Sequence, residues 1–277
     1  MAPDRGFSAR FWGVRGSIAC PGADYVIYGG NTPCVETRCG SRLLVFDAGT
    51  GLRNLGKSIA EDGITDVDLF LSHTHVDHIV GFPFFSFAFN PENTLRVWSG
   101  HLVGGLTTEN VLRQFMIAPL FPVPVDIFAA DVSYHDFSAG DTLTPADNVT
   151  LRTTMLNHPQ NSTGYRVEFG GKSICYVTDT EHFEDGPDQN ILGLIDGADI
   201  VIYDSMFTDA EYPDYKEWGH STWQEGARLC AAANVGTFVI FHHLPERTDA
   251  ELDGIAAAVD EMRPGSLVAR EGMTLKP

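Results

Sequence analysis

The sequence predicts an α/β (α+β) fold in which two β-sheets pack face to face and helices cover their outer surfaces. Short alternating or continuous apolar runs in each half of the chain are typical of strands, and segments with helical spacing follow them. Two strand-rich halves of this kind bury their apolar faces as a four-layer αββα sandwich. We expect residues 1–277 to form a single domain, because layered α/β folds commonly reach this length as one unit.

Glycine-rich turns join the first predicted strands, with no helix between them, which is typical of antiparallel pairing. The strands of this half are expected at 7–14, 34–37, 43–46, 67–71 and 95–98. Helical spacing predicts helices over 52–60 and 108–116, with Thr108 as the cap of the second. Three prolines at 119–124 then favour an extended segment. We expect a lid or insert at about 90–135, with a rigid connector as the alternative.

The second half returns to strands and ends in helices. Its strands are expected at 127–129, 142–143, 149–153, 165–169, 172–177, 198–204 and 237–241. Gly170-Gly171 between two of these runs is a hairpin signal. Helices are expected at 191–195, 223–233 and from Thr248 to about Met262, and the last two begin at the capping boxes Thr222/Glu225 and Thr248/Glu251.

Composition favours a globular protein with a small substrate. The chain is 43% hydrophobic and 20% charged, which is ordinary for a domain with a sizeable core. Its net charge is −19, from 18 Lys+Arg against 37 Asp+Glu, and this sign repels polyanions at long range. Extended contact with nucleic acid is therefore disfavoured, whereas the oligomeric state is left open.

The cysteine content, together with the lack of a secretory-signal-like or membrane-spanning apolar segment, predicts a cytoplasmic protein. The five cysteines are an odd number without zinc-finger spacing, which suits reduced thiols. The first residues lack the apolar core of a secretory signal, and no run of ~18 apolar residues could cross a membrane. We therefore expect no membrane partner.

Four metal-binding side chains lie within the six residues His73-Thr74-His75-Val76-Asp77-His78, directly after the apolar run 67–71. Alternate side chains of an extended segment point the same way, so His73 and His75 can converge on one ion while Asp77 and His78 turn toward a second. Imidazole and carboxylate are suitable ligands for zinc, manganese or iron. Two ions held close together can catalyse hydrolysis by stabilising both the attacking and the leaving oxygen. The alternative is a surface cluster of polar residues.

The pattern His-x-His-x-Asp-His resembles the first metal motif of the metallo-β-lactamase fold superfamily. Three further stretches are similar to the ribonuclease Z and cyclic-phosphodiesterase branch of that superfamily: Trp12-Gly-Val-Arg-Gly-Ser17, Gly29-Gly-Asn-Thr32 and Asp47-Ala-Gly-Thr-Gly51. The resemblance covers nearly the whole chain. It implies the αββα sandwich and a bacterial metal-dependent hydrolase.

The resemblance also implies the remaining metal ligands, at the ends of predicted strands. His158 is similar to the third histidine of the superfamily, Asp179 to the bridging carboxylate and His242 to the last histidine, with His243 as the alternative to His242. One divalent ion would then bind His73, His75 and His158, and a second would bind Asp77, His78 and His242, with Asp179 shared. Zinc is the expected metal, and manganese or iron are alternatives.

Two residues, His220 and Arg15, are candidates for contact with substrate, and Asp77 is a further candidate for catalysis. His220 lies in Gly-His-Ser before a capped helix, where an anion is favoured, and the resemblance implies that it contacts the phosphate and acts as general acid. A histidine of the capping region without chemistry is the alternative. Arg15 is a candidate phosphate contact or a turn arginine. Asp77 would orient the nucleophile, and Glu181 and His182 either support the ligands or are polar loop residues.

These residues predict a dinuclear metal-dependent phosphodiesterase that acts on a small phosphodiester, a cyclic nucleotide or a cyclic sugar phosphate, through attack by metal-bound hydroxide. Asp179 in place of cysteine departs from the penicillin-cleaving zinc enzymes, and the motif lacks the additional acidic residue of the di-iron flavoproteins. The alternatives are a ribonuclease Z-like tRNA 3′ endonuclease, a glyoxalase II-like thioesterase and a non-catalytic metal- or nucleotide-binding sensor.

Overall fold

Two seven-stranded sheets pack face to face in the computed structural model, which describes residues 6–277. The first sheet has the order β14 (Thr274–Leu275), β1 (Phe7–Gly13), β2 (Cys34–Cys39), β3 (Arg42–Phe46), β4 (Asp66–Leu71), β5 (Thr94–Ser99), β6 (Asp131–Asp136). The second has the order β13 (Leu267–Val268), β12 (Thr237–Phe241), β11 (Ile200–Asp204), β10 (Lys172–Val177), β9 (Ser162–Phe169), β8 (Val149–Leu156), β7 (Thr142–Ala146).

Each sheet combines antiparallel and parallel strands. The predicted antiparallel opening is confirmed, because β1, β2 and β3 pair in that way, and β3 to β6 are then parallel. In the second sheet β7 to β10 are antiparallel and β10 to β13 are parallel. As a result, the carboxyl ends of the parallel strands in each sheet lie along one edge.

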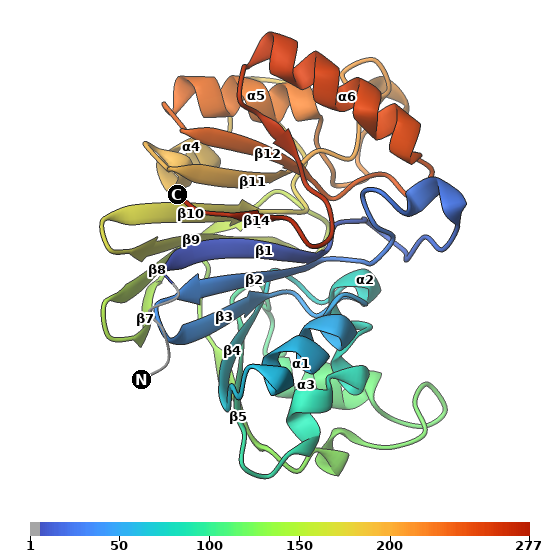
Figure 1. The fold of residues 1–277 in the computed structure, drawn as a ribbon, viewed down its shortest axis with the longest axis vertical. Coiled ribbons are helices and arrows are strands. Elements are labelled where there is room, and N and C mark those ends of the chain that lie inside the picture. The colour runs from blue at the N-terminus through green and yellow to red at the C-terminus, as the bar shows by residue number, and fades with distance from the viewer. Residues whose placement is uncertain (1–5) are drawn as a thin grey trace.

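Helices cover both outer faces, as the αββα prediction requires (Figure 1). The α-helices are α1 (Leu52–Glu61), α2 (Val76–Ile79), α3 (Thr108–Phe115), α4 (Gln189–Ile195), α5 (Trp223–Ala232) and α6 (Asp249–Met262). Short 3-10 helices are η1 (Ala23–Tyr25), η2 (Phe82–Phe84), η3 (Ser86–Phe89), η4 (Val125–Ile127) and η5 (Tyr212–Asp214). Helices α4, α5 and α6 lie against the second sheet, and α1 and α3 lie against the first (Figure 1).

The core has three apolar layers that match this architecture. One layer, with Phe46, Phe70, Tyr165 and Tyr176, fills the space between the two sheets. The other two lie between each sheet and its helices. All five cysteines are buried free thiols, as predicted. Among residues 6–277, no helix combines the length and hydropathy needed to cross a membrane.

Several element boundaries differ from the predictions. The expected strand at 127–129 is wrong, because the backbone after Pro124 turns into η4, where Ile127 N donates to the Pro124 carbonyl (3.1 Å). Thr107 rather than Thr108 caps α3, and Thr108 instead donates to Asp136 (2.6 Å). The box at Thr248 and Glu251 forms with both of its hydrogen bonds.

Strands β5 and β6 fall inside the 90–135 region that the sequence analysis assigned to a lid or insert. They extend the first sheet as parallel strands next to β4. Within this region, residues 90–93 and 100–130 lie outside the sheet, and the longer stretch includes α3 and the proline-rich segment. The candidate lid is therefore confined to that connection between two strands.

Candidate metal centre

Four of the seven predicted ligands follow strands at the same edge of the sandwich, and the other three lie at the N-terminus of the short helix α2, with His75 as its N-cap and Asp77 and His78 within it. His73 lies two residues after β4, His158 two after β8, Asp179 two after β10 and His242 directly after β12. Asp179 (φ 56°) and His242 (φ 60°) have left-handed backbone conformations, which non-glycine residues seldom adopt. Strained residues of this kind are concentrated at functional sites.

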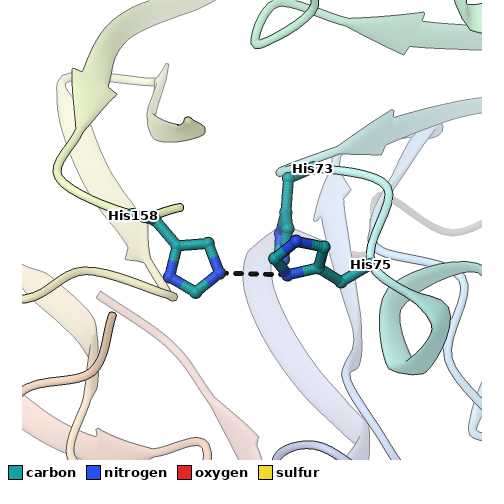
Figure 2. Close-up of side chains that lie close together, drawn as sticks. All are labelled: His73, His75 and His158. Carbon is teal, nitrogen blue, oxygen red and sulfur yellow. Dashed lines mark hydrogen bonds between the residues drawn. The ribbon is translucent and has the colours of Figure 1, made fainter. Parts of the chain in front are cut away.

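Three histidines form what we call the open set: His73, His75 and His158 (Figure 2). The His158 Nδ1–H donates to the Gly219 carbonyl (2.7 Å), and the His75 Nε2–H donates to Gln160 (3.0 Å). These bonds leave the lone pairs of His158 Nε2 and His75 Nδ1 facing each other at 3.1 Å. Two facing lone pairs repel, so the pair requires a proton or a cation between them.

Three residues form what we call the enclosed set: Asp77, His78 and His242. The His78 Nδ1–H donates to Asp47 (2.8 Å), so its Nε2 faces Asp77 Oδ2 at 3.2 Å. His242 Nε2 lies 3.5 Å from the same oxygen. All three side chains are buried, whereas His75 of the open set is half-buried.

Asp179 lies between the two sets and presents a different oxygen to each. Its Oδ2 is 3.5 Å from His73 Nε2 and 3.6 Å from His158 Nε2. Its Oδ1 is 3.3 Å from His78 Nε2 and 3.2 Å from His242 Nε2. Two ligand atoms each ~2.1 Å from a tetrahedral zinc ion are about 3.4 Å apart, so these spacings suit one ion on each oxygen.

The residues present fit two cations. His73 Nε2, His78 Nε2 and His242 Nε2 are buried and have no hydrogen-bond partner. Burial of an unpaired polar atom is costly, and one metal ion in each set would satisfy these atoms, His73 in the open set and His78 and His242 in the enclosed set. The geometry thus brings together all seven ligands that the resemblance implied, and His242 rather than His243 faces the carboxylates.

The charges of the site are arranged for metal binding. Burial alone would raise the pKa of Asp179, but His242, His78 and His73 hold it well below its usual value. Burial likewise opposes ionisation of Asp77, and His78 and His242 nonetheless lower its pKa. Burial lowers the pKa of His73, helped by the neighbouring His78. The carboxylates are therefore ionised, as metal ligands must be.

Asp47 orients a ligand of the enclosed set, a role that the sequence did not predict although Asp47 belongs to the Asp-Ala-Gly-Thr-Gly stretch. It follows β3, is fully buried and has φ 63°. Its carboxylate accepts from His78 Nδ1 (2.8 Å), Ser72 Oγ (2.8 Å) and the Tyr176 hydroxyl (2.8 Å). Such a partner fixes the orientation of a ligating imidazole. An aspartate ending a strand was the only available signal.

Asp204, the last residue of β11, is a second supporting residue without a role in the sequence analysis. Its Oδ2 accepts from His220 Nδ1 (2.9 Å) and from the backbone N–H of Thr180 (3.0 Å). Burial alone would lower the pKa of His220, but Asp204 raises it to about 9. His220 therefore holds a proton at neutral pH.

His220 lies against a histidine of each set. Its ring centroid is 5.4 Å from that of His158 and 5.0 Å from that of His242. The loop before it is held by Glu181, whose carboxylate accepts from Gly219 N (2.9 Å). His182 Nδ1 contacts Ser221 Oγ at 3.0 Å. Glu181 and His182 thus support the His220 loop and do not contact the ligands.

Arg15 does not join this cluster. Its side chain is fully buried, and its guanidinium donates to the carbonyls of Gly29 (2.8 Å) and Arg247 (2.6 Å). A group enclosed in this way cannot meet a substrate, so the expected phosphate contact is replaced by a structural role. His243 is likewise turned away, because its Nε2–H donates to the Ala269 carbonyl (2.8 Å).

A β-lactamase superfamily domain matches residues 42–243. Ribonuclease Z from Picrophilus torridus is 23% identical over 292 aligned positions, which cover 89% of this chain and 88% of that protein. The metallo-beta-lactamase fold protein YhfI from Bacillus subtilis has a TM-score of 0.73 at 18% identity and covers 98% of this chain and 99% of its own. A diphosphatase from the PhnP family has a TM-score of 0.70 at 17% identity, with 98% of each chain covered.

The matched domain spans most of the chain, including the motif at His73 and the histidine at 242. The fold is the two-sheet sandwich with helices outside. The chain therefore belongs to the metallo-β-lactamase fold superfamily of metal-dependent hydrolases.

Proposed function

We propose that this chain is a dinuclear metal-dependent phosphodiesterase that hydrolyses a small phosphodiester, such as a cyclic nucleotide or a cyclic sugar phosphate. The observation that carries the proposal is the position of Asp179, which presents one oxygen to the open set and the other to the enclosed set. His220, whose pKa is raised by Asp204, lies against both sets. Its position supports a reaction in which an acid lies beside a phosphate whose charge two metal ions neutralise.

The open set would hold one ion and the enclosed set the other, with Asp179 shared. When bound, the two ions would neutralise the phosphate oxygens and make the attacking water more acidic, with zinc as the expected metal and manganese or iron as alternatives. Asp77 orients the nucleophile, and its own position is fixed because Oδ2 accepts from the backbone N–H of Ser17 (2.9 Å).

His220 completes the hydrolysis by proton transfer. The water oxygen forms a bond to phosphorus and loses one proton to solvent, the bond from phosphorus to the leaving oxygen breaks, and the His220 proton passes to that oxygen. His220 then regains a proton from solvent. A cyclic diester gives a single phosphomonoester with a free hydroxyl group, whereas an open diester gives a phosphomonoester and an alcohol. Asp204 holds the imidazole by its Nδ1–H, which leaves Nε2–H to face the leaving group.

A ribonuclease Z activity is the second candidate, because the relative from Picrophilus torridus carries that name. Clamping a tRNA requires several cations, and the net charge of −19 opposes such binding. Cations of the second half are also engaged: Arg247 pairs with Glu211 (2.7 Å), and Arg228 pairs with Asp209 (2.8 Å). These observations favour the small diester.

The test is hydrolysis of bis(4-nitrophenyl) phosphate by protein stripped of metal and reloaded separately with zinc or manganese. A β-lactam, a thioester and a precursor tRNA are run beside it. The proposal expects metal-restored turnover of the diester and none of the lactam. Thioester turnover alone would contradict it in favour of a thioesterase, and specific cleavage of the precursor tRNA would favour ribonuclease Z.

A variant separates the role of His220 from metal binding. His220→Ala should lower kcat by about 10²-fold to 10⁴-fold, the usual contribution of general acid catalysis, and retain both ions. His135→Ala is the matched control, because His135 stacks on Trp98 (4.2 Å) in the first sheet, away from the ligands. Metal loss from the His220 variant equal to its loss of activity would remove the assigned role.

A further inference from the structure

Trp218 exposes 62% of its surface, although it lies on the loop that leads into His220. The other tryptophans, Trp12, Trp98 and Trp223, are buried or half-buried. An indole is large and mostly apolar, so its exposure carries a cost in water that a bound partner can remove. The exposed indole, on the loop that leads into His220, is therefore a candidate for contact with a ligand.

The backbone on both sides of Trp218 is fixed. One carboxylate, that of Glu181, accepts from Glu217 N (2.8 Å) and from Gly219 N (2.9 Å). The Gly219 carbonyl accepts from the ligand His158 (2.7 Å). Gly219 has φ 84°, and a Cβ there would lie 2.4 Å from His158 Nδ1, so the loop is held tightly against the metal centre.

The indole also has aromatic support that connects it to His220. Tyr215 meets Trp218 edge to face at a centroid distance of 5.3 Å. Tyr215 in turn stacks on Phe207 at 4.4 Å, and Phe207 lies 6.3 Å from His220. A row of contacting aromatic rings, Phe207, Tyr215 and Trp218, which we call the platform, thus leads from the proposed general acid out to solvent.

The surroundings of this platform favour an apolar, planar ligand over a second anion. Lys216, the nearest cation along the loop, is paired with Glu184. Two other exposed apolar side chains are next in sequence to residues of the centre: Val76 (62% exposed) precedes Asp77, and Ile18 (65% exposed) follows Ser17. Recognition beyond the phosphate would therefore depend on stacking and apolar contact.

We propose that Trp218 determines substrate specificity by stacking on a planar ring carried by the phosphodiester, so that the substrate is a nucleotide-type diester and not an aliphatic or sugar diester. This inference rests on the proposed phosphodiesterase function and narrows its substrate class. Stacking of one base on an aromatic side chain changes affinity by about 10-fold to 100-fold. Trp218 acts in binding and takes no part in proton transfer.

The test measures binding by calorimetry to full-length, metal-loaded protein, with adenosine 5′-monophosphate and ribose 5-phosphate as probes. The two differ by the ring alone. Wild type should bind the nucleotide at least about 10-fold more tightly. Trp218→Leu should remove that difference, and Trp218→Phe should keep most of it. Phe89→Leu, at an exposed aromatic ring packed on Phe128, is the matched control and should behave as wild type.

Two results would overturn the inference: wild type that binds both probes equally or binds neither, or a preference that persists in Trp218→Leu. Metal content is measured in each variant, so that damage to the centre is not mistaken for loss of stacking. Turnover of bis(4-nitrophenyl) phosphate by wild type reports separately on the proposed function. Diester turnover without preference for the nucleotide would contradict the stacking role of Trp218 but not the proposed function. Preference for the nucleotide without diester turnover would contradict the phosphodiesterase but not the stacking role.

Discussion

The open and enclosed sets differ in what stands behind their ligands. The open set is oriented by neutral partners, the Gln160 side chain and the Gly219 carbonyl, and His75 is half-buried. The enclosed set is buried and backed by the carboxylate of Asp47. A charged, buried partner fixes an imidazole more firmly and makes it more basic than a neutral, exposed one. The enclosed set is therefore expected to hold its ion more tightly.

The largest effect is expected where the two sets meet. Among residues 6–277, Asp179 is the carboxylate that faces both sets, so Asp179→Ala should lose both ions. Its kcat should fall by at least about 10³-fold, beyond the 10-fold to 100-fold typical of a supporting residue. Metal analysis and diester hydrolysis measure this. Asp199→Asn, which removes a carboxylate paired with Lys172, is the control and should keep both ions. Retention of one ion by Asp179→Ala would show that the sets are independent.

The next effect separates the two sets directly. His75→Ala and His78→Ala should each lose one ion. Only His78→Ala should also lower the free energy of unfolding of the metal-free protein, by about 1–3 kcal/mol, because Asp77 and Asp47 lose a buried partner. Urea unfolding of both metal-free variants gives the comparison. Equal stabilities would mean that burial does not distinguish the sets.

Residues that hold the ligands in place should show the same difference between the two sets, with smaller effects on metal binding. Asp47→Asn removes the charged partner of His78 and should weaken binding of one ion by about 10-fold to 100-fold, whereas Gln160→Ala should have less than about 10-fold effect on the other. Competition with a chelator measures both. The comparison between sets is wrong if Gln160→Ala has the larger effect.

The smallest change is a shift in pH dependence. Asp204 raises the pKa of His220 to about 9, and an acid must keep its proton, so activity should fall as pH rises through that pKa. Asp204→Asn lowers the pKa, and the alkaline limb of kcat should therefore move to lower pH. An unmoved limb would mean that His220 is not the group that titrates.

Much of this centre could be predicted from residues that follow apolar runs. Periodicity locates the strands of the αββα architecture, and the four side chains of the motif at 73–78 are recognisable as ligands by type and spacing. The other three, His158, Asp179 and His242, were implied by the family resemblance. The surroundings of individual side chains could not be predicted in this way. The burial of Arg15 and the roles of Asp47 and Asp204 depend on contacts across both sheets, between residues far apart in the chain. Local pattern carries no record of such contacts.

The most direct test of the account is a zinc titration of metal-free protein in which bound metal and diester hydrolysis are followed together. If Asp179 joins two ions into one catalytic centre, the first equivalent should fill the enclosed set and give little activity. Turnover should then rise with the second equivalent. Full activity at one equivalent, or none at two, would contradict a dinuclear phosphodiesterase.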